Sequence, residues 1–260
     1  GKIWTADNKL ANGGHYQMSN SRDGRIITAF NAHPAGVDVR TNLYFLQTGD
    51  MGKSWTTMDG RVVETPVDVL KNPALVRDYK SENRLVYLKD IQFDAEGNPV
   101  LFYITSAFHQ PGPKDEPRFW TVAHWTGTAW KFHEIARATH NYDMGSLYIE
   151  DNLWRIIAPT EPGPQHWGTG GEMAVWTSND KGVTWLKNRD ITKDSEFNHC
   201  YARRPVNAHP DFYAFWADGH ADEFSPSCLY FTNKEGTAFW QLPATMKADF
   251  ATPTLMTKKE

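Results

Sequence analysis

Ser178-Asn179-Asp180-Lys181-Gly182-Val183-Thr184-Trp185 is the stretch of sequence that decides the fold. An Asp side chain in a turn can accept hydrogen bonds from backbone N–H groups of the same turn, and Gly supplies a positive φ. The tryptophan then begins the outgoing strand and packs beneath the turn. The octet therefore predicts a tight β-hairpin turn between two strands.

Related stretches recur along the chain. A close copy occupies 48–55, a weaker copy occupies 232–240, and the weakest ends at Trp130. Trp130, Trp185 and Trp240 are 55 residues apart at each step, and a fixed period of this length indicates a repeated supersecondary unit. The octet resembles the Asp box of bacterial neuraminidase repeats, which occur in β-propeller proteins that mostly handle carbohydrate.

Composition narrows the class of protein. The 260 residues are 40% hydrophobic and 22% charged, which is enough for one large or two small domains with a core. The many aromatic residues suit strands, and packing between sheets explains most of them. A net charge of −4 without a basic tract argues against a nucleic-acid partner. No apolar run approaches about 18 residues, so no membrane span is predicted.

Strand patterns and turn signals divide the chain into four repeats of four strands. The predicted repeats occupy 14–58, 87–135, 140–188 and 198–242. Each is expected to form a four-stranded antiparallel meander, which is one propeller blade. The sequence therefore predicts an all-β fold in which residues 1–260 form a single β-propeller domain.

Two segments do not fit the simple repeat. Residues 59–84 are expected to be an insertion between the first two blades, with a short helix near 73–79, so that 55–58 would form the fourth strand of the first blade. Residues 252–256 resemble the first strand of another blade, so either the two ends of the chain combine into a closing blade or the chain is part of a larger propeller.

Strand direction sorts the loops onto two rims. Because direction alternates within a blade, the Asp boxes share one rim with the short turns between first and second strands. The opposite rim receives long loops rich in Pro, Gly and charge, at 34–41, 106–119, 159–171 and 218–226. Long loops on a rigid scaffold usually carry binding residues. The site is therefore predicted on the rim opposite the Asp boxes.

Histidine, tyrosine and lysine residues gather at the strand ends of that rim. They are His15 and His33 in the first blade, Lys89 in the second, His140 and Tyr142 in the third, and His199, Tyr201 and His220 in the fourth. Hairpin pairing places His15 across from about Ala32 or His33, and His199 across from about His220. A single buried histidine is more often structural, but repetition at equivalent positions favours a proton-transfer site.

The two cysteines indicate little about function. Cys200 and Cys228 form neither a CxxC motif nor a zinc quartet, and a disulfide between them stays open. Strand alternation turns Cys200 away from His199, so these two neighbours are not expected to bind one metal.

A longer set of motifs resembles the seven-bladed propeller polysaccharide lyases, which include ulvan lyases and enzymes that cleave rhamnose linked to glucuronate. The motifs cover about 15–245 and are His15 with His33, Tyr87-Leu88-Lys89-Asp90-Ile91, Gln110-Pro111-Gly112-Pro113 with Pro117-Arg118, His140-Asn141-Tyr142-Asp143-Met144-Gly145-Ser146-Leu147 and Arg155-Ile156-Ile157-Ala158-Pro159-Thr160. A sister group with the same scaffold is described as α-L-rhamnosidases acting on rhamnosyl-glucuronate ends.

The resemblance implies β-elimination within an acidic plant or algal polysaccharide or oligosaccharide. It also implies a seven-bladed ring, of which this chain would be a part incomplete at both ends, and a secreted or periplasmic location, although no signal peptide is visible in the sequence. No cofactor is required. A structural zinc or calcium ion near the axis is implied for some relatives, and His199 with His220 would supply two ligands.

The resemblance also assigns catalytic roles. His15 would act as base or acid, Tyr142 would be its partner in proton transfer, and His33 would hold the carboxylate or an adjacent hydroxyl. The residues expected to bind substrate are Lys89, Arg118, His140, Glu161 and Tyr201.

One role of the ulvan lyases does not transfer. In the ulvan lyases, the arginine that neutralises the carboxylate lies at the end of the second strand of the third blade. Here Arg155 lies at the beginning of that strand, and Tyr142 is expected to face about Glu161. Lys89 or Arg118 would then have to neutralise the carboxylate, which makes the rhamnose–glucuronate group the nearer match.

Other functions stay open. A neuraminidase is disfavoured because its arginine triad and Arg-Ile-Pro signature are absent. A glycosidase would need two carboxyl groups at a defined separation, and the candidates are Glu161, Asp143, Asp218 and Asp222. A non-catalytic glycan-binding propeller would use Trp120, Trp167 and Phe224 as stacking platforms.

Overall fold

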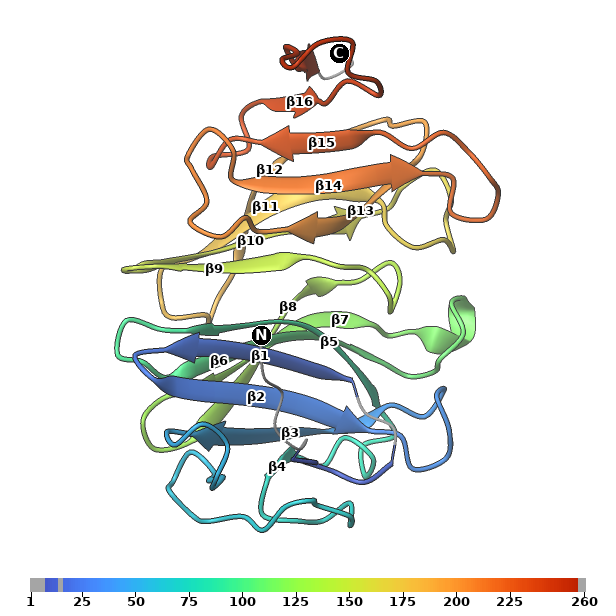
Figure 1. Ribbon diagram of the computed structural model, residues 1–260. Coiled ribbons are helices and arrows are strands. Elements are labelled where there is room, and N and C mark those ends of the chain that lie inside the picture. The colour runs from blue at the N-terminus through green and yellow to red at the C-terminus, as the bar shows by residue number, and fades with distance from the viewer. Residues whose placement is uncertain (1–7, 14–15, 257–260) are drawn as a thin grey trace.

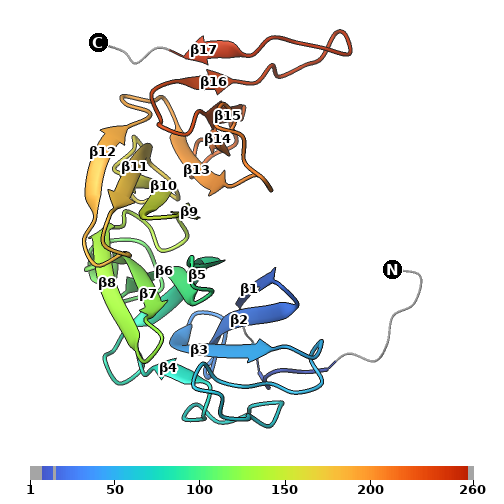
Figure 2. The ribbon, with the colours of Figure 1, turned by 90° about the vertical axis from the view of Figure 1, so that its left-hand side faces the viewer.

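Four antiparallel sheets follow one another along the chain in the computed structural model, which describes residues 8–13 and 16–256. Within each sheet the strands lie in chain order. The sheets are arranged along an arc, with β1, β5, β9 and β13 on its inner side (Figures 1 and 2). These are propeller blades, so the all-β propeller fold predicted from the Asp boxes is confirmed.

The strands have the following bounds. The first blade contains β1 (Gln17–Arg22), β2 (Arg25–Ala32), β3 (Thr41–Thr48) and β4 (Leu75–Arg77). The second contains β5 (Leu85–Phe93), β6 (Pro99–Ser106), β7 (Phe119–Trp125) and β8 (Trp130–Arg137). The third contains β9 (Ser146–Glu150), β10 (Leu153–Glu161), β11 (Glu172–Ser178) and β12 (Leu186–Asp190). The fourth contains β13 (Asn198–Arg203), β14 (Ala214–Gly219), β15 (Leu229–Thr232), β16 (Phe239–Gln241) and β17 (Thr254–Met256).

The outer edge of the first blade differs from the prediction. Residues 55–58 do not form its fourth strand, because the chain turns again at Gly60, whose φ is 83°, and Thr56 makes only isolated bridges. β4 pairs with β3 instead. The helix predicted near 73–79 was therefore also wrong, since this segment contains a strand.

The C-terminal strand was assigned to the wrong place as well. Residues 252–256 were expected to begin another blade, but β17 pairs antiparallel with β16 and becomes a fifth strand of the fourth sheet. Met256 packs against the core that the third and fourth blades share. Burial of this side chain offers a reason why the strand returns to the sheet edge.

The described residues contain no α-helix. Their single helical element is a 3-10 turn, η1 (Pro113–Asp115), in the long loop after β6. Within the described part, no helix is long and apolar enough to cross a membrane.

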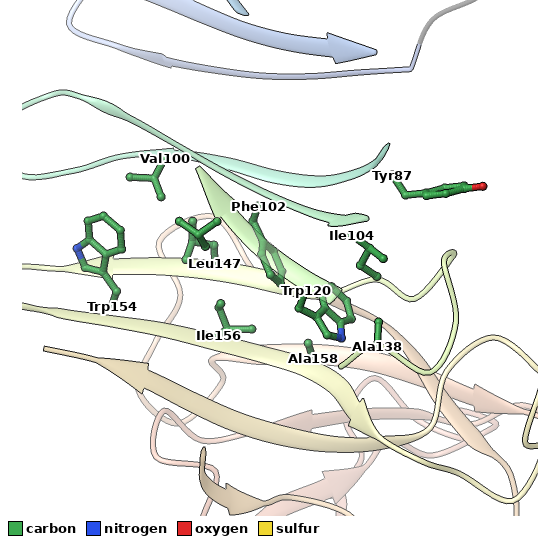
Figure 3. Packing of buried hydrophobic residues seen from close by; sticks show 11 residues of the cluster. Tyr87, Val100, Phe102, Ile104, Trp120, Ala138, Leu147, Trp154, Ile156 and Ala158 are labelled. Atoms are coloured by element: carbon green, nitrogen blue, oxygen red, sulfur yellow. The ribbon is translucent and has the colours of Figure 1, made fainter. Parts of the chain in front are cut away.

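The hydrophobic core lies between adjacent blades. Between the second and third blades, the Phe102 and Trp120 rings stack with centroids 5.0 Å apart, and Trp154 and Ile156 pack from the facing sheet (Figure 3). Burial of each large apolar side chain contributes about 1.5–3 kcal/mol. Tyr87 lies at one end of this cluster, with its hydroxyl pointing away from the other side chains (Figure 3).

The two outermost blades treat their free faces differently. On the first blade, Phe30 and Tyr44 pack against Val63 and against other residues of the segment that the sequence predicted as an insertion. On the fourth blade, Leu229 is 49% exposed and Leu255 is 55% exposed. The segment 59–84 thus covers one end of the arc, whereas the other end exposes apolar side chains.

The Asp-box turns are built as the sequence predicted. In the turn after β11, the Asp180 carboxylate accepts hydrogen bonds from the Thr184 N–H at 2.9 Å and the Thr184 hydroxyl at 2.6 Å. Gly182 has a φ of 84°. Asn233 makes the corresponding bonds to Thr237 in the fourth blade. Each turn is closed by its own side chains.

Candidate functional site

A cavity of about 430 Å³ opens on the inner side of the arc, where β1, β5 and β13 approach one another. Its lining comes from all four blades and consists of Tyr16, Gln17, Met18, Asn31, Arg40, Tyr87, Leu88, Lys89, Tyr142, Met144, Tyr201 and Arg203. These residues lie at or near strand ends on the rim away from the Asp boxes. The long loops gather at the same rim, on the right of Figure 1.

Arg40 lies at the centre of an aromatic cage in this cavity. Its guanidinium carbon is 4.5 Å from the ring centroid of Tyr16, 5.0 Å from that of Tyr87 and 4.7 Å from that of Tyr142. The three rings belong to the first, second and third blades. The cage therefore holds one cation between three repeats through cation–π contacts.

The hydrogen bonds of Arg40 are few for a buried guanidinium. Its side chain is 8% exposed; Nε donates to the Val37 carbonyl at 3.0 Å and Nη2 donates to the Tyr16 hydroxyl at 3.4 Å. Among residues 8–13 and 16–256, no carboxylate lies within 4 Å of it. Its backbone carbonyl accepts a 2.7 Å hydrogen bond from Val86 N, which fixes the residue against β5.

Lys89 enters the cavity through a β-bulge. The pairing of β5 with β6 shifts between Leu88 and Asp90, so Lys89 is the extra residue. A bulge re-aims side chains, and here Leu88 and Lys89 both line the cavity although they are adjacent in sequence. Lys89 is buried, and its Nζ donates to the Asn141 carbonyl at 2.9 Å. Burial lowers the pKa of Lys89, and the charge of Asp143 opposes that shift.

A second bulge presents Tyr201. The pairing of β13 with β14 shifts between Cys200 and Arg203, and Tyr201 has a φ of 62°, which is uncommon for a residue other than glycine. Tyr201 and Arg203 both line the cavity. Two of the three inner strands at this site thus depart from regular alternation where they reach the cavity.

The cavity is electropositive in a protein of net negative charge. Arg40, Lys89 and Arg203 line it, and its lining contains no aspartate or glutamate. A cavity lined by charges of one sign concentrates ions of the opposite sign. The arrangement is suited to an anionic ligand.

Tyr142 and His140 form one edge of the site. The Tyr142 ring packs edge-on to Tyr87, and no described residue hydrogen-bonds its hydroxyl. His140 is buried behind it, and its Nδ1 accepts a 3.0 Å hydrogen bond from Tyr142 N. Burial, together with the charges of Arg118 and Lys89, lowers the pKa of His140 to about 4. Near neutral pH His140 is thus uncharged, and this hydrogen bond holds it against Tyr142.

Of the two histidines predicted in the first blade, His33 lies beside the cavity. His15 lies outside the described residues. His33 follows β2, and its ring centroid is 5.1 Å from that of Tyr16. His33 is therefore next to the cavity lining without being part of it.

Arg118 and Glu161, like His140, are predicted substrate-binding residues that are absent from the cavity lining. Arg118 is buried and forms an ion pair with Asp115, with 3.0 Å between Nη1 and Oδ2. Glu161 does not face Tyr142, because its Oε1 is 3.1 Å from Lys187 Nζ. Both side chains have local partners of opposite charge, which explains why they are held away from the cavity.

His199 and His220 do not pair with each other, and both ring nitrogens of His199 and the Nδ1 of His220 have partners within the protein. His199 pairs with Asp218 rather than His220, its Nδ1 accepts a 2.8 Å hydrogen bond from Trp216 Nε1, and its Nε2 lies 3.0 Å from Ser195 Oγ. His220 Nδ1 accepts bonds from the backbone of Asp222 and Glu223. In the described part of the chain, no three His, Cys, Asp or Glu side chains are grouped to bind a metal.

The two cysteines and Arg155 also lie outside the cavity lining. Cys200 and Cys228 are free thiols. Arg155, which the sequence placed near the Asp boxes, is 1% exposed, and its Nη2 is 3.2 Å from Glu235 Oε1 and 3.6 Å from Glu150 Oε2.

A larger cavity of about 520 Å³ has the opposite character. Glu161, Glu172, Asp190 and Asp194 line it together with Lys193. Glu172 accepts hydrogen bonds from Ser195 N and Ser195 Oγ, both at 2.8 Å, and from Thr192. Its carboxylate is thus occupied by neighbours, as is that of Glu161.

Sequence reasoning missed Arg40 and Arg203. Arg40 ends the long loop 34–41, which the rim argument singled out, but it has no counterpart in the other repeats. A search for basic residues at the ends of long loops, in addition to strand ends, would have found it.

Comparison with solved structures supports the fold. An ulvan lyase of a new polysaccharide lyase family is 16% identical with a TM-score of 0.68, over 85% of this chain and 51% of that one. The same kind of enzyme bound to -[GlcA(1-4)Rha3S]- is 14% identical with a TM-score of 0.70, over 87% and 53%. A Dyadobacter fermentans protein of unknown function is 16% identical with a TM-score of 0.53, over 94% and 64%.

The chain spans about half the length of the ulvan lyase structures that it matches. No protein of curated function matches the sequence. The family model described as BNR repeat-containing family member matches residues 6–138, which is just over half of the chain and includes the first Asp box and Arg40. The chain therefore belongs to this BNR repeat-containing family.

Proposed function

We propose that the protein is a polysaccharide lyase that cleaves a uronic-acid-containing glycan of the rhamnose–glucuronate type by β-elimination. The observation that carries the proposal is the cavity on the inner side of the arc. Three basic side chains and four tyrosines line it, and no carboxylate does. The structural likeness to ulvan lyases supports the same substrate class for the whole protein.

The chemistry of elimination matches these groups. A base removes the proton from C5 of the uronate, and the electron pair of that C–H bond forms the C4=C5 double bond. The C4–O bond then breaks, and its electron pair goes to the leaving oxygen, which takes a proton from an acid. The negative charge that develops on the carboxylate side of C5 needs cations or hydrogen-bond donors. Arg40, Lys89 and Arg203 are suited to that task.

Tyr142 is the proposed acid or base among the described residues. Its hydroxyl has no hydrogen-bond partner in the described part of the protein, and its ring is fixed by Tyr87 and by His140. His15 is the proposed second proton-transfer group, and His33 is proposed to hold the carboxylate or a hydroxyl. Binding of a carboxylate beside Lys89 would favour the charged form of its amine, since a nearby opposite charge raises the pKa of an amine.

A glycoside hydrolase is a poorer match to the same site. Hydrolysis by retention or inversion needs two carboxyl groups beside the scissile bond. The cavity lining contains none, and Glu161 and Glu172 in the acidic cavity are held by Lys187 and by Ser195. The groups that line the cationic cavity therefore fit elimination better than hydrolysis.

The test is digestion of a glucuronate–rhamnose polysaccharide while the ultraviolet absorbance of a conjugated double bond is followed. Elimination creates that bond, and hydrolysis does not. We expect absorbance to rise with wild-type protein and not with His15→Ala. Saturated products would overturn the lyase proposal in favour of a hydrolase. If no acidic glycan gave any product, the proposal would be overturned in favour of a glycan-binding protein.

A further inference from the structure

Arg40 differs from the other buried arginines in lacking a carboxylate partner. Arg118 pairs with Asp115, and Arg155 pairs with Glu235 and Glu150. In the described residues, Arg40 instead has three tyrosine rings, one carbonyl and one long hydrogen bond to a hydroxyl. A buried cation without an anion is unfavourable unless a ligand supplies one.

The aromatic cage leaves the binding edge of the guanidinium available. Ring faces contact the guanidinium through its π system, which uses none of its N–H groups. Nε is occupied by the Val37 carbonyl. The donors of Nη1 and the second donor of Nη2 have no partner among the described residues, and a planar fork of this kind matches a carboxylate in bidentate fashion.

The end of β10 supplies no cation to the cavity. At the end of β10, Ala158 is fully buried, the Thr160 hydroxyl accepts a hydrogen bond from Trp176 Nε1 at 2.8 Å, and Glu161 is acidic. The cations of the cavity come from elsewhere, namely from the loop before β3, from β5 and from β13.

Of these three cations, Arg40 is the one fitted for recognition. Arg203 is solvent-exposed, so water screens its charge. Lys89 is a single ammonium group already bonded to the Asn141 carbonyl. Arg40 alone combines burial, a fixed orientation and a fork geometry within the described residues of this cavity.

We propose that Arg40, clamped by Tyr16, Tyr87 and Tyr142, is the residue that binds the uronate carboxylate of the substrate and gives the site its selectivity for an acidic sugar. This inference rests on the proposed function for the identity of the sugar. The clamp draws its rings from three blades, so selectivity depends on how the blades are packed together.

The experiment compares binding of a glucuronate–rhamnose disaccharide with binding of its methyl ester, which removes the charge and adds one methyl group, using calorimetric titration. Wild-type protein should prefer the acid by about 10- to 100-fold, the range expected for charge-assisted hydrogen bonds. Arg40→Lys should lose most of that preference, because an ammonium group cannot make the bidentate contact.

Arg77→Lys is the matched control. The Arg77 guanidinium also lies over two rings, at 4.5 Å from Tyr79 and 4.8 Å from Phe132, but it pairs with Glu82 and is outside the cavity. Its replacement should leave the preference for the acid unchanged. If Arg40→Lys fails to fold, Tyr16→Leu serves instead, because Tyr16 is half exposed and removes one ring and one hydrogen bond from the clamp.

The outcomes separate this inference from the lyase proposal. Loss of acid preference in Arg40→Lys or in Tyr16→Leu, with Arg77→Lys unaffected, supports the inference even if no unsaturated product ever forms. Retention of the preference in the Arg40 variant overturns it, even if the wild-type protein is a lyase. Equal binding of acid and ester by wild-type protein also overturns it.

Discussion

Arg155 and Arg40 are both buried, but they lie toward opposite rims of the blades and have opposite surroundings. Arg155 binds Glu235, which belongs to the last Asp-box-like turn, and Glu150 in the turn after β9. Arg40 is enclosed by neutral rings and, among the described residues, has no anion. The buried arginine toward the Asp-box rim is thus neutralised by carboxylates of the protein, although its Nε has no hydrogen-bond partner among the described residues. The buried arginine at the cavity rim has no counter-charge among the described residues. Changes at the first rim should therefore alter stability, and changes at the second should alter binding and catalysis.

Tyr142→Phe should have the largest effect and should separate the two rims most clearly. Loss of a proton-transfer group typically lowers the rate by about 100- to 10,000-fold, and we expect kcat for elimination to fall by that amount with little change in the melting temperature. Tyr44→Phe is the control, because the Tyr44 hydroxyl donates to the Leu70 carbonyl on the covered face of the first blade. That variant should lose some stability and keep its kcat. An unchanged kcat in Tyr142→Phe would remove Tyr142 from the mechanism.

Gly182→Ala should show the opposite behaviour at the Asp-box rim. A Cβ at Gly182 would lie 2.6 Å from the Trp154 ring, and the residue has a φ of 84°. We expect a loss of roughly 2–5 kcal/mol in the free energy of unfolding, from backbone strain plus overpacking, measured by urea titration. Gly97→Ala isolates the strain, because Gly97 has the same φ and no atom within 4 Å of its Cβ position. If the two variants lose equal stability, the Trp154 contact is unimportant.

The pH dependence of stability tests the buried imidazole behind Tyr142. The pKa of His140 is about 4 in the folded protein and about 6.5 in an unfolded chain. Between these values the unfolded state binds more protons, so stability is lost as pH falls from 6.5 toward 4, by up to about 3 kcal/mol. His140→Asn keeps an acceptor for Tyr142 N and does not titrate. The variant should lose less stability over this range than wild type, and parallel curves would show that His140 is not the titrating group.

Asp180→Asn should have the smallest effect. The fourth blade already uses Asn233 in the equivalent turn, where it bonds Thr237 through both its amide nitrogen and its oxygen. We expect a loss of about 0.5–1 kcal/mol in the free energy of unfolding, since the bond with the Thr184 hydroxyl reverses its direction rather than disappearing. Substrate binding should not change. A measurable shift in Kd for an acidic disaccharide would contradict the separation of the two rims.

The fold was predictable because its signals are local. An Asp box encloses its own hydrogen bonds, so a repeat of Ser, Asp, Gly and Trp within eight residues defines a hairpin without knowledge of the rest of the chain. The rims follow from strand direction alone. The same logic failed at 55–58, because a second turn at Gly60 ends that segment early.

The site was predictable only in part, because its decisive contacts join distant segments. Lys89, Tyr142 and Tyr201 were found at strand ends, and all three line the cavity. The cage around Arg40 needs rings from three blades, and nothing near Arg40 in the sequence indicates them. The strand register could also not be predicted where strands bulge. His199 was expected to pair with about His220 but pairs with Asp218, and the extra residue between Cys200 and Arg203 accounts for part of that shift.

The outer faces of the first and fourth blades differ in how much of their apolar surface is covered. On the first blade, Val63, Val67 and Ala74 pack against residues of β2 and β3. On the fourth blade, Phe215, Leu229 and Leu255 remain open to solvent. Polar substitutions should therefore be tolerated at the exposed positions of the fourth blade and be disruptive on the covered face of the first.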